Sequence, residues 1–175
     1  MSDWTRDELM SINAARALAG ARTCFVGIGL PSTAANLARR TVRPDLVLIY
    51  ESGALGAKPT RLPLSIGDGE RADTADAVVS VPEMFNYWLQ AGRIDVGFLG
   101  AAQIDRFANI NTTLIDRGPG RPPIRLPGAG GAPEIAANCR EVLIVLRHSP
   151  RGFVERLDFI TSVGHYRGGE SRKEL

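Results

Sequence analysis

A single acidic residue stands directly after a run of apolar residues that has the character of a buried strand. The segment LVLIYESGALG, residues 46–56, places Glu51 behind five apolar residues, and glycines follow at positions 53 and 56. Open α/β sheets bind ligands just beyond the carboxyl ends of their strands, and Gly53 and Gly56 would let the backbone approach a ligand closely. Glu51 is therefore a candidate catalytic carboxylate. A paired surface acid is the alternative, and this segment alone does not decide between the two.

A second candidate is the glycine-rich segment LPGAGGAPE, residues 126–134. Gly128, Gly130 and Gly131 lie beside a predicted helix start, and the backbone N–H groups of such a turn can bind an oxyanion or a phosphate. An ordinary flexible connection explains the same composition equally well.

Other patterns typical of active sites are weaker. GIGLPS, residues 27–32, resembles a dinucleotide-binding turn, but Ser32 occupies the position of the third glycine, so a tight strand-to-helix turn is the simpler interpretation. Ser52 lies outside the GxSxG pattern of a hydrolase nucleophile. The two histidines have no HxxxH or HExxH spacing and the two cysteines form no CxxC pair, so we predict no metal site and two reduced core thiols.

The elements that would position these residues alternate between helices and strands. Capping boxes at Thr5 and Glu8 and at Ser80 and Glu83 begin two of the helices. Buried strands are predicted in the segments TCFVGIG, DLVLIY, IDVGFLGAAQID and EVLIVLRH, and residues 116–139 are predicted to form a long loop that leads into a short helix. This order predicts an α/β fold with an open, mainly parallel sheet and helices on both faces.

The bulk composition excludes several classes of protein. With 175 residues, of which 44% are hydrophobic and 23% charged, the chain is expected to form a single globular domain at residues 1–175. A net charge of +2 predicts no nucleic-acid partner, and no apolar run is long enough to cross a membrane. The polar N-terminal segment is not typical of a signal peptide, so we expect a cytoplasmic protein.

Four segments together resemble the β subunit of the family I CoA transferases, the group of the glutaconate, 3-oxoacid and 3-oxoadipate enzymes. VGIGLPSTAANLA is similar to that family's glycine turn and helix, YESGALG to its Ser-Glu-Asn-Gly active-site segment, AGRIDVGFLGAAQIDRFANIN to its Gly-Gly-(His/Arg)-Ile-Asp-Val stretch, and PGAGGAPEIA to its Gly-Met-Gly-Gly-Ala loop. The segments follow the family's order and span nearly the whole chain. Residues 51–70 look closest to the glutaconate-like branch.

The resemblance implies a role for each candidate. Glu51 would be the nucleophile that attacks an acyl-CoA thioester and then carries CoA as a glutamyl thioester. The oxyanion or CoA would be bound by Gly128, Gly130, Gly131 and Ala132, with Gly130 and Gly131 as the foremost donors. A substrate pocket would be formed by Gly27, Gly29, Ser52, Gly53, Gly56 and Asn109. The CoA thioester would be a substrate, with no permanently bound cofactor and no metal, and an α subunit would complete the site in a hetero-oligomer.

Some departures from the family pattern leave other functions open. Ala108 replaces the family's glycine before Asn109. Family β subunits usually continue through further strands, so a domain truncated at its C-terminus is also left open. Relatives on the same fold hydrolyse or ring-open CoA thioesters, and a non-catalytic subunit could bind an anionic metabolite on the same scaffold. A glutamate retained in the ESG segment favours transfer over both.

Overall fold

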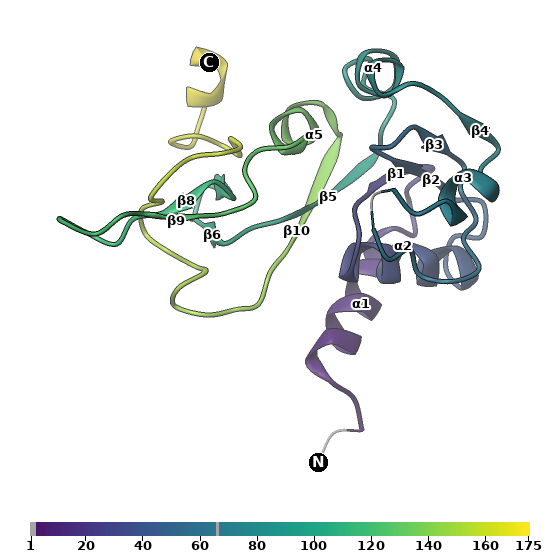
Figure 1. Cartoon of the computed structure of the whole chain (residues 1–175), viewed down its shortest axis with the longest axis horizontal. Coiled ribbons are helices and arrows are strands. Elements are labelled where there is room, and N and C mark those ends of the chain that lie inside the picture. Colours follow the sequence, from purple (N-terminus) through teal and green to yellow (C-terminus); the bar gives the residue numbers. More distant parts are fainter. Residues whose placement is uncertain (1–2, 66) are drawn as a thin grey trace. The chain divides into compact units, whose positions relative to one another are not determined.

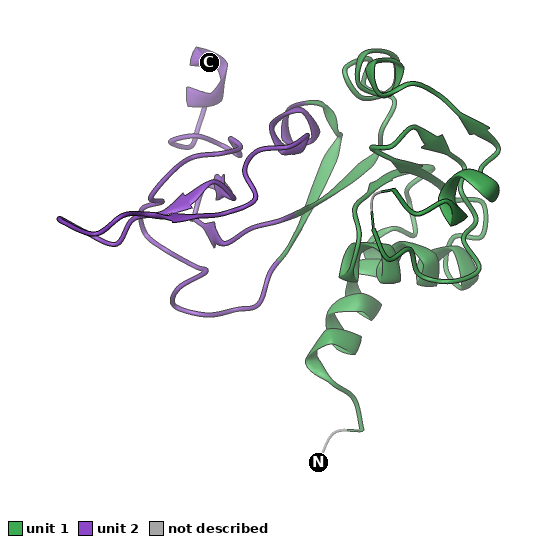
Figure 2. Cartoon of the chain, in the orientation of Figure 1, with its two compact units in different colours: residues 1–99, 138–145 green, residues 100–137, 146–175 purple. Residues whose placement is uncertain are grey.

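The computed structural model describes residues 3–65 and 67–175, which divide into two compact units (Figure 1 and Figure 2). Unit 1 comprises residues 1–99 and 138–145, and unit 2 comprises residues 100–137 and 146–175. The chain therefore leaves unit 1 once, returns to it for one strand, and leaves it again.

Unit 1 is built on a six-stranded sheet in the order β10-β5-β1-β2-β3-β4. Its strands are β1 (Thr23–Val26), β2 (Val47–Tyr50), β3 (Ala54–Leu55), β4 (Ala77–Val78), β5 (Val96–Gly100) and β10 (Glu141–Val145). β1 pairs in parallel with both β2 and β5, whereas β3 and β4 add antiparallel pairs at one edge. The mainly parallel sheet predicted from the sequence is confirmed, and its antiparallel edge is an addition.

Helices α1 (Arg6–Ala17) and α2 (Leu30–Arg40) pack together against one face of this sheet. The predicted capping box begins α1, because the Thr5 hydroxyl accepts from the Glu8 N–H at 3.2 Å and the Glu8 carboxylate accepts from the Thr5 N–H at 2.6 Å. The side of α2 that faces the core carries fully buried alanines, which let the helix lie close to the strands: Ala34, Ala35 and Ala38.

The opposite face of the sheet is covered by α4 (Val81–Glu83) and the π-helical segment η1 (Met84–Leu89) that continues it. Phe25 packs edge to face against Phe85 of η1 with ring centroids 6.3 Å apart. Successive side chains of a strand point to opposite faces, and the neighbours of Phe25 in β1 belong to the core beneath α1 and α2. Helices therefore lie on both faces, as predicted.

A loop between β3 and the short helix α3 (Glu70–Asp73) is held together by Asp68. The Asp68 carboxylate accepts from the Leu64 N–H at 2.9 Å and from both terminal nitrogens of Arg61 at 2.9 Å. These hydrogen bonds lower the pKa of Asp68 to about 2, and the one from the Leu64 N–H has the largest effect.

Unit 2 contains two small antiparallel sheets and little helix. β6 (Gln103–Ile104) pairs with β7 (Ile110–Asn111), and β8 (Leu114–Ile115) pairs with β9 (Ile124–Arg125). Helix α5 (Ala132–Asn138) follows, and a 3₁₀ turn at Ser171–Glu174 lies near the C-terminus. The predicted loop at residues 116–139 does lead into a short helix, α5, but it also contains the strand β9. This strand was missed because two residues between prolines and glycines are too few to show any periodicity.

None of the helices formed by the described residues is both long enough and apolar enough to cross a bilayer.

Candidate functional site

Glu51 lies at the carboxyl end of a core strand of unit 1. It directly follows β2, whose last residue, Tyr50, is paired in register with Val26, the last residue of the parallel strand β1. The turn after β1, Gly27–Gly29, therefore emerges next to Glu51 at the same edge of the sheet. This is the edge at which open α/β sheets bind their ligands.

The Glu51 side chain is half-buried and forms no polar contact with the described residues. Its carboxylate has neither a hydrogen bond nor an ion pair with any residue that the structure describes. A carboxylate that only stabilised the fold would be expected to hold a cation or a backbone N–H, as Asp68 does. The interpretation of Glu51 as a paired surface acid therefore loses its support.

The turn after Glu51 is fixed by the backbone itself. The Gly53 N–H donates to the Tyr50 carbonyl at 2.9 Å, and the Gly56 N–H donates to the Leu48 carbonyl at 2.8 Å. These bonds fold the chain back from β2 into β3. Glu51 and Ser52 therefore stand at the tip of a closed turn and not in a loose loop.

Glycine is required at positions 53 and 56 by close contacts within the fold, which the sequence did not reveal. Gly53 has φ +97°, and a Cβ there would lie 1.9 Å from the Val79 carbonyl oxygen; at Gly56, with φ +66°, it would lie 2.2 Å from an Asp76 carboxylate oxygen. The space beside both glycines is thus filled by the chain itself. Their place in a substrate pocket stays a prediction.

The glycines after β1 are different, because open space surrounds them. A Cβ at Gly27 or Gly29 would meet no atom within 4 Å, and Gly29 adopts φ +74° as the N-cap of α2. The backbone N–H groups of residues 27–29 find no acceptor in the described part of the chain. Free donors at the start of an 11-residue helix, beside Glu51, suit an anionic part of a substrate.

Beneath Glu51, Tyr50 is fully buried in a polar environment that the sequence did not indicate. The buried Arg71 of α3 places its guanidinium 4.9 Å from the centre of the Tyr50 ring. Burial raises the pKa of Tyr50, and nearby Ser32 and Asn36 partly offset that effect. The Tyr50 hydroxyl still lacks a well-formed hydrogen bond among the described residues. Nothing in the loop sequence distinguishes Arg71 from its exposed neighbours, so only the fold identifies it as a support of β2.

The second predicted site, the glycine loop, lies in unit 2. The Gly128 N–H donates to the Thr112 carbonyl at 2.8 Å, and the Ala132 N–H donates to the Ala129 carbonyl at 3.0 Å. The N–H groups of Gly130 and Gly131, by contrast, have no acceptor in the part of the chain that is described. Of the four residues expected to bind an oxyanion or CoA, these two are the ones whose donors are free.

Asn109, the last of the predicted pocket residues, is saturated by contacts within unit 2. Its Nδ2 donates to the Asp105 carboxylate at 2.8 Å and to the Tyr166 carbonyl at 2.7 Å, while its Oδ1 accepts from the Gly164 N–H at 2.9 Å and the Tyr166 N–H at 3.1 Å. An amide side chain has two donors and two acceptor positions, and all four are used. Asn109 thus joins the loop after β6 to the C-terminal segment, and its place in a substrate pocket stays a prediction.

The described residues bring together no group of three or more His, Cys, Asp or Glu side chains that could hold a metal ion. Cys24 is buried, Cys139 is half-buried, and both are free thiols. Burial raises the pKa of Cys139 to about 12 and raises that of Cys24 further. Both thiols are therefore poor nucleophiles, in keeping with the predicted core role.

Comparison with known proteins bears on this geometry. The family model for coenzyme A transferase matches residues 8–174. The chain is 66% identical over its full length to one subunit of the 3-oxoadipate CoA-transferase of Pseudomonas knackmussii, and it covers 67% of that subunit. It thus spans about two thirds of the length of this relative.

Two solved structures share the fold at lower identity. Glutaconate coenzyme A-transferase from Acidaminococcus fermentans has a TM-score of 0.85 at 29% identity, with 99% of this chain and 68% of that chain covered. The decarboxylase AibA/AibB has a TM-score of 0.82 at 27% identity, with 93% and 68% covered. The same fold therefore occurs in proteins of more than one chemistry. By the family model and by these relatives, the chain belongs to the coenzyme A transferase family.

Proposed function

We propose that the chain is the Glu51-bearing subunit of a CoA transferase that moves CoA between a thioester and a carboxylic acid of the 3-oxoadipate type. The observation that carries the proposal is the half-buried carboxylate of Glu51, which stands without a partner among the described residues at the carboxyl end of β2. The substrate class rests on the 66% identity to one subunit of a 3-oxoadipate CoA-transferase.

The proposed reaction needs one carboxylate nucleophile. A Glu51 oxygen attacks the thioester carbonyl, the C–S bond breaks, and CoA leaves as a thiolate from a mixed acyl anhydride. The thiolate then attacks the glutamyl carbonyl and releases the first acid as its carboxylate. A glutamyl-CoA thioester results, and the acceptor acid reverses both steps to leave as its CoA ester and regenerate Glu51.

Each step passes through a tetrahedral oxyanion, which needs hydrogen-bond donors. We propose that Gly130 and Gly131 of unit 2 supply them, because their N–H groups have no acceptor among the described residues. Removing one donor of this kind commonly costs on the order of a hundredfold in rate. The open turn at Gly27–Gly29 would bind another anionic part of the substrate, next to Glu51.

The proposal also covers the cofactor, the partner subunit and the localisation of the enzyme. CoA is a substrate here and no permanently bound cofactor is required, because the carboxylate alone carries the group. An α subunit would complete the site and exclude water from the anhydride. We therefore expect the isolated chain to be inactive, and we place the enzyme in the cytoplasm.

Intact-protein mass spectrometry tests the proposal directly. The chain, copurified with its partner subunit, is incubated with 3-oxoadipyl-CoA and other acyl-CoA thioesters, and peptide mapping locates any mass gain. We expect a gain equal to CoA less one water, the mass of a glutamyl-CoA thioester, on the peptide that carries Glu51. The gain should be absent in Glu51→Gln and present in the control Glu83→Gln, which removes the carboxylate of the last residue of α4.

Two outcomes would overturn the proposal. Free acid and CoA appearing at the normal rate in Glu51→Gln would show hydrolysis by another group. Turnover of a thioester without any adduct on Glu51, and with carbon dioxide released, would assign the chain to the decarboxylase chemistry of AibA/AibB.

A further inference from the structure

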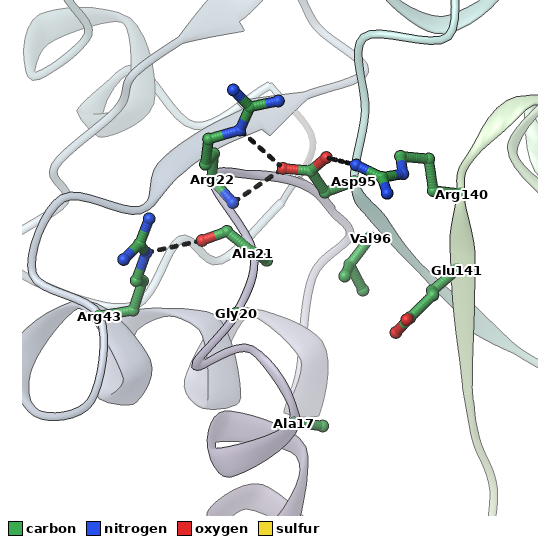
Figure 3. Close-up of a pocket in the computed structure, with 9 residues that line it drawn as sticks. All are labelled: Ala17, Gly20, Ala21, Arg22, Arg43, Asp95, Val96, Arg140 and Glu141. Carbon is green, nitrogen blue, oxygen red and sulfur yellow. Dashed lines mark hydrogen bonds and ion pairs between the residues drawn. The ribbon is translucent and has the colours of Figure 1, made fainter.

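A cavity of about 420 Å³ lies at the amino ends of the parallel strands of unit 1, at the other end of the strands from Glu51 (Figure 3). It opens where β1, β5 and β10 begin, whereas Glu51 follows the end of β2. Its lining consists of small apolar residues and five charged ones: Ala17, Gly20, Ala21, Arg22, Arg43, Asp95, Val96, Arg140 and Glu141. A volume of this size lies within the range of small-molecule binding sites.

Asp95 organises the charged residues of the cavity. Its carboxylate accepts from the backbone N–H of Arg22 at 2.8 Å, lies 3.7 Å from Nε of Arg22, and lies 3.3 Å from a terminal nitrogen of Arg140. Burial alone would raise the pKa of Asp95, but these hydrogen bonds and the two guanidinium charges outweigh it and hold that pKa below its usual value. Asp95 is thus an ionised carboxylate that pairs with two largely exposed cations.

The guanidinium groups are not exhausted by these contacts. Arg43 uses its Nε, which donates to the Ala21 carbonyl at 2.8 Å and lies 3.3 Å from the exposed Asp45. The terminal nitrogens of Arg43 and Arg22 donate no hydrogen bond to the residues that the structure describes, although both guanidinium groups are ion-paired through Nε. The cavity is therefore lined by planar forks of donors, which match carboxylate oxygens in geometry.

The arrangement of the cations indicates the shape of a ligand. In Figure 3, Arg43 and Arg140 lie at opposite ends of the lining, with Ala21 and Val96 between them. The lining carries three guanidinium charges and the two carboxylates of Asp95 and Glu141, and the exposed Asp45 beside Arg43 adds a third carboxylate. A molecule with an anionic group at each end and a short apolar chain in the middle would match this pattern.

We propose that this cavity binds a short-chain dicarboxylate, with one carboxylate at Arg43 and the other near Arg22 and Arg140. The site is separate from the proposed nucleophile, because β1 and β2 run parallel and their four residues span roughly 13 Å from one edge of the sheet to the other. The proposal does not depend on the transferase chemistry. Three carboxylates oppose the ligand, because Asp95 and Glu141 line the cavity and Asp45 lies beside Arg43, and each would repel an anion.

Site-resolved NMR titration of the ¹⁵N-labelled chain tests the proposal. Adipate is added, and the matched controls are hexanoate, which has one carboxylate, and adipamide, which has none. We expect adipate to shift the amides of Arg22, Thr23 and Val96, hexanoate to bind at least about tenfold more weakly, and adipamide to cause no shift. Shifts confined to Ser52 and Gly53 would report the Glu51 edge of the sheet and would overturn the proposal.

Three variants extend the test, because two of them should weaken the binding of adipate and one should strengthen it. Arg43→Gln and Arg140→Gln should each weaken adipate by about tenfold, the effect of one lost charge-assisted hydrogen bond. Glu141→Gln removes one opposing carboxylate, the one without an ion pair among the described residues, and should tighten binding. None of these residues is part of the proposed catalytic site, so adduct formation on Glu51 should persist in all three. Equal adipate affinity in Arg43→Gln, Arg140→Gln and the parent chain would refute the assignment.

Discussion

Substitution of Gly53 by alanine tests how the turn after Glu51 is held. Gly53 adopts φ +97°, and the added Cβ would lie 1.9 Å from the carbonyl oxygen of Val79. That oxygen belongs to the backbone beside β4, so it cannot swing away as a flexible side chain would. Either β4 or the Glu51 turn has to move.

The cost has two parts. Placing an alanine at a left-handed φ costs about 1–2 kcal/mol. Relieving the contact with Val79 also strains or breaks the hydrogen bond from the Val79 N–H to the Gly53 carbonyl, 3.0 Å long, which adds about 1 kcal/mol, and it disturbs the pairing of β3 with β4. We expect a total loss of about 2–4 kcal/mol in the free energy of unfolding, which leaves a typical domain folded.

A matched control separates the two parts. Gly92 also has a left-handed φ, +68°, but a Cβ there would meet no atom within 4 Å. Gly92→Ala should therefore show only the backbone strain, about 1–2 kcal/mol. Urea unfolding followed by circular dichroism gives both values, and the rate of adduct formation at Glu51 shows whether the turn has moved.

Equal losses in Gly53→Ala and Gly92→Ala would refute this reasoning, because the contact with Val79 would then cost nothing. A slowed adduct in Gly53→Ala, with normal rates in Gly92→Ala, is the result expected if the turn positions the carboxylate.

Other parts of the chain offer further tests. Ala108 has φ 58°, so Ala108→Gly should relieve backbone strain and leave stability unchanged or raised by up to about 1 kcal/mol in urea unfolding; a loss would contradict that strain. Tyr50→Phe removes a buried hydroxyl without a well-formed hydrogen bond among the described residues, so its free energy of unfolding should fall by less than about 1 kcal/mol or rise, and a larger loss would reveal a hidden partner. The pKa of Asp68 is lowered to about 2 from 3.8, so its stabilisation is complete above about pH 4 and is lost as the pH falls towards 2. Asp68→Asn should flatten that part of a curve of urea midpoint against pH, and an unchanged slope would contradict the assignment. Because burial raises the pKa of both Cys24 and Cys139, neither thiol should react readily with N-ethylmaleimide in the folded chain, whereas both should react in urea. Fast labelling without denaturant would show that this part of unit 1 opens.

Local patterns in the sequence predicted much of unit 1. The capping box at Thr5 and Glu8, the apolar segment before Glu51 and the small residues of α2 each act over a few neighbouring positions, so their effect can be predicted without the fold. Unit 2 was predicted less well, because its two-residue strands have no periodicity to detect. The division of the chain into two units left no composition shift to signal it.

The sequence by itself determined the alternation of strands and helices, the family resemblance, and the presence of a carboxylate at the end of a core strand. Only the tertiary structure decided what surrounds these features. It showed that the Val79 carbonyl leaves no room for a side chain at Gly53. It also showed that the Asn109 side chain is hydrogen-bonded to residues 55 and 57 positions away, and that Arg22, Arg43 and Arg140 line one cavity. The physical reason is that these contacts join segments far apart in the chain. Such segments are brought together by the connections between strands and helices, and the spacing of neighbouring residues does not predict which segments will meet.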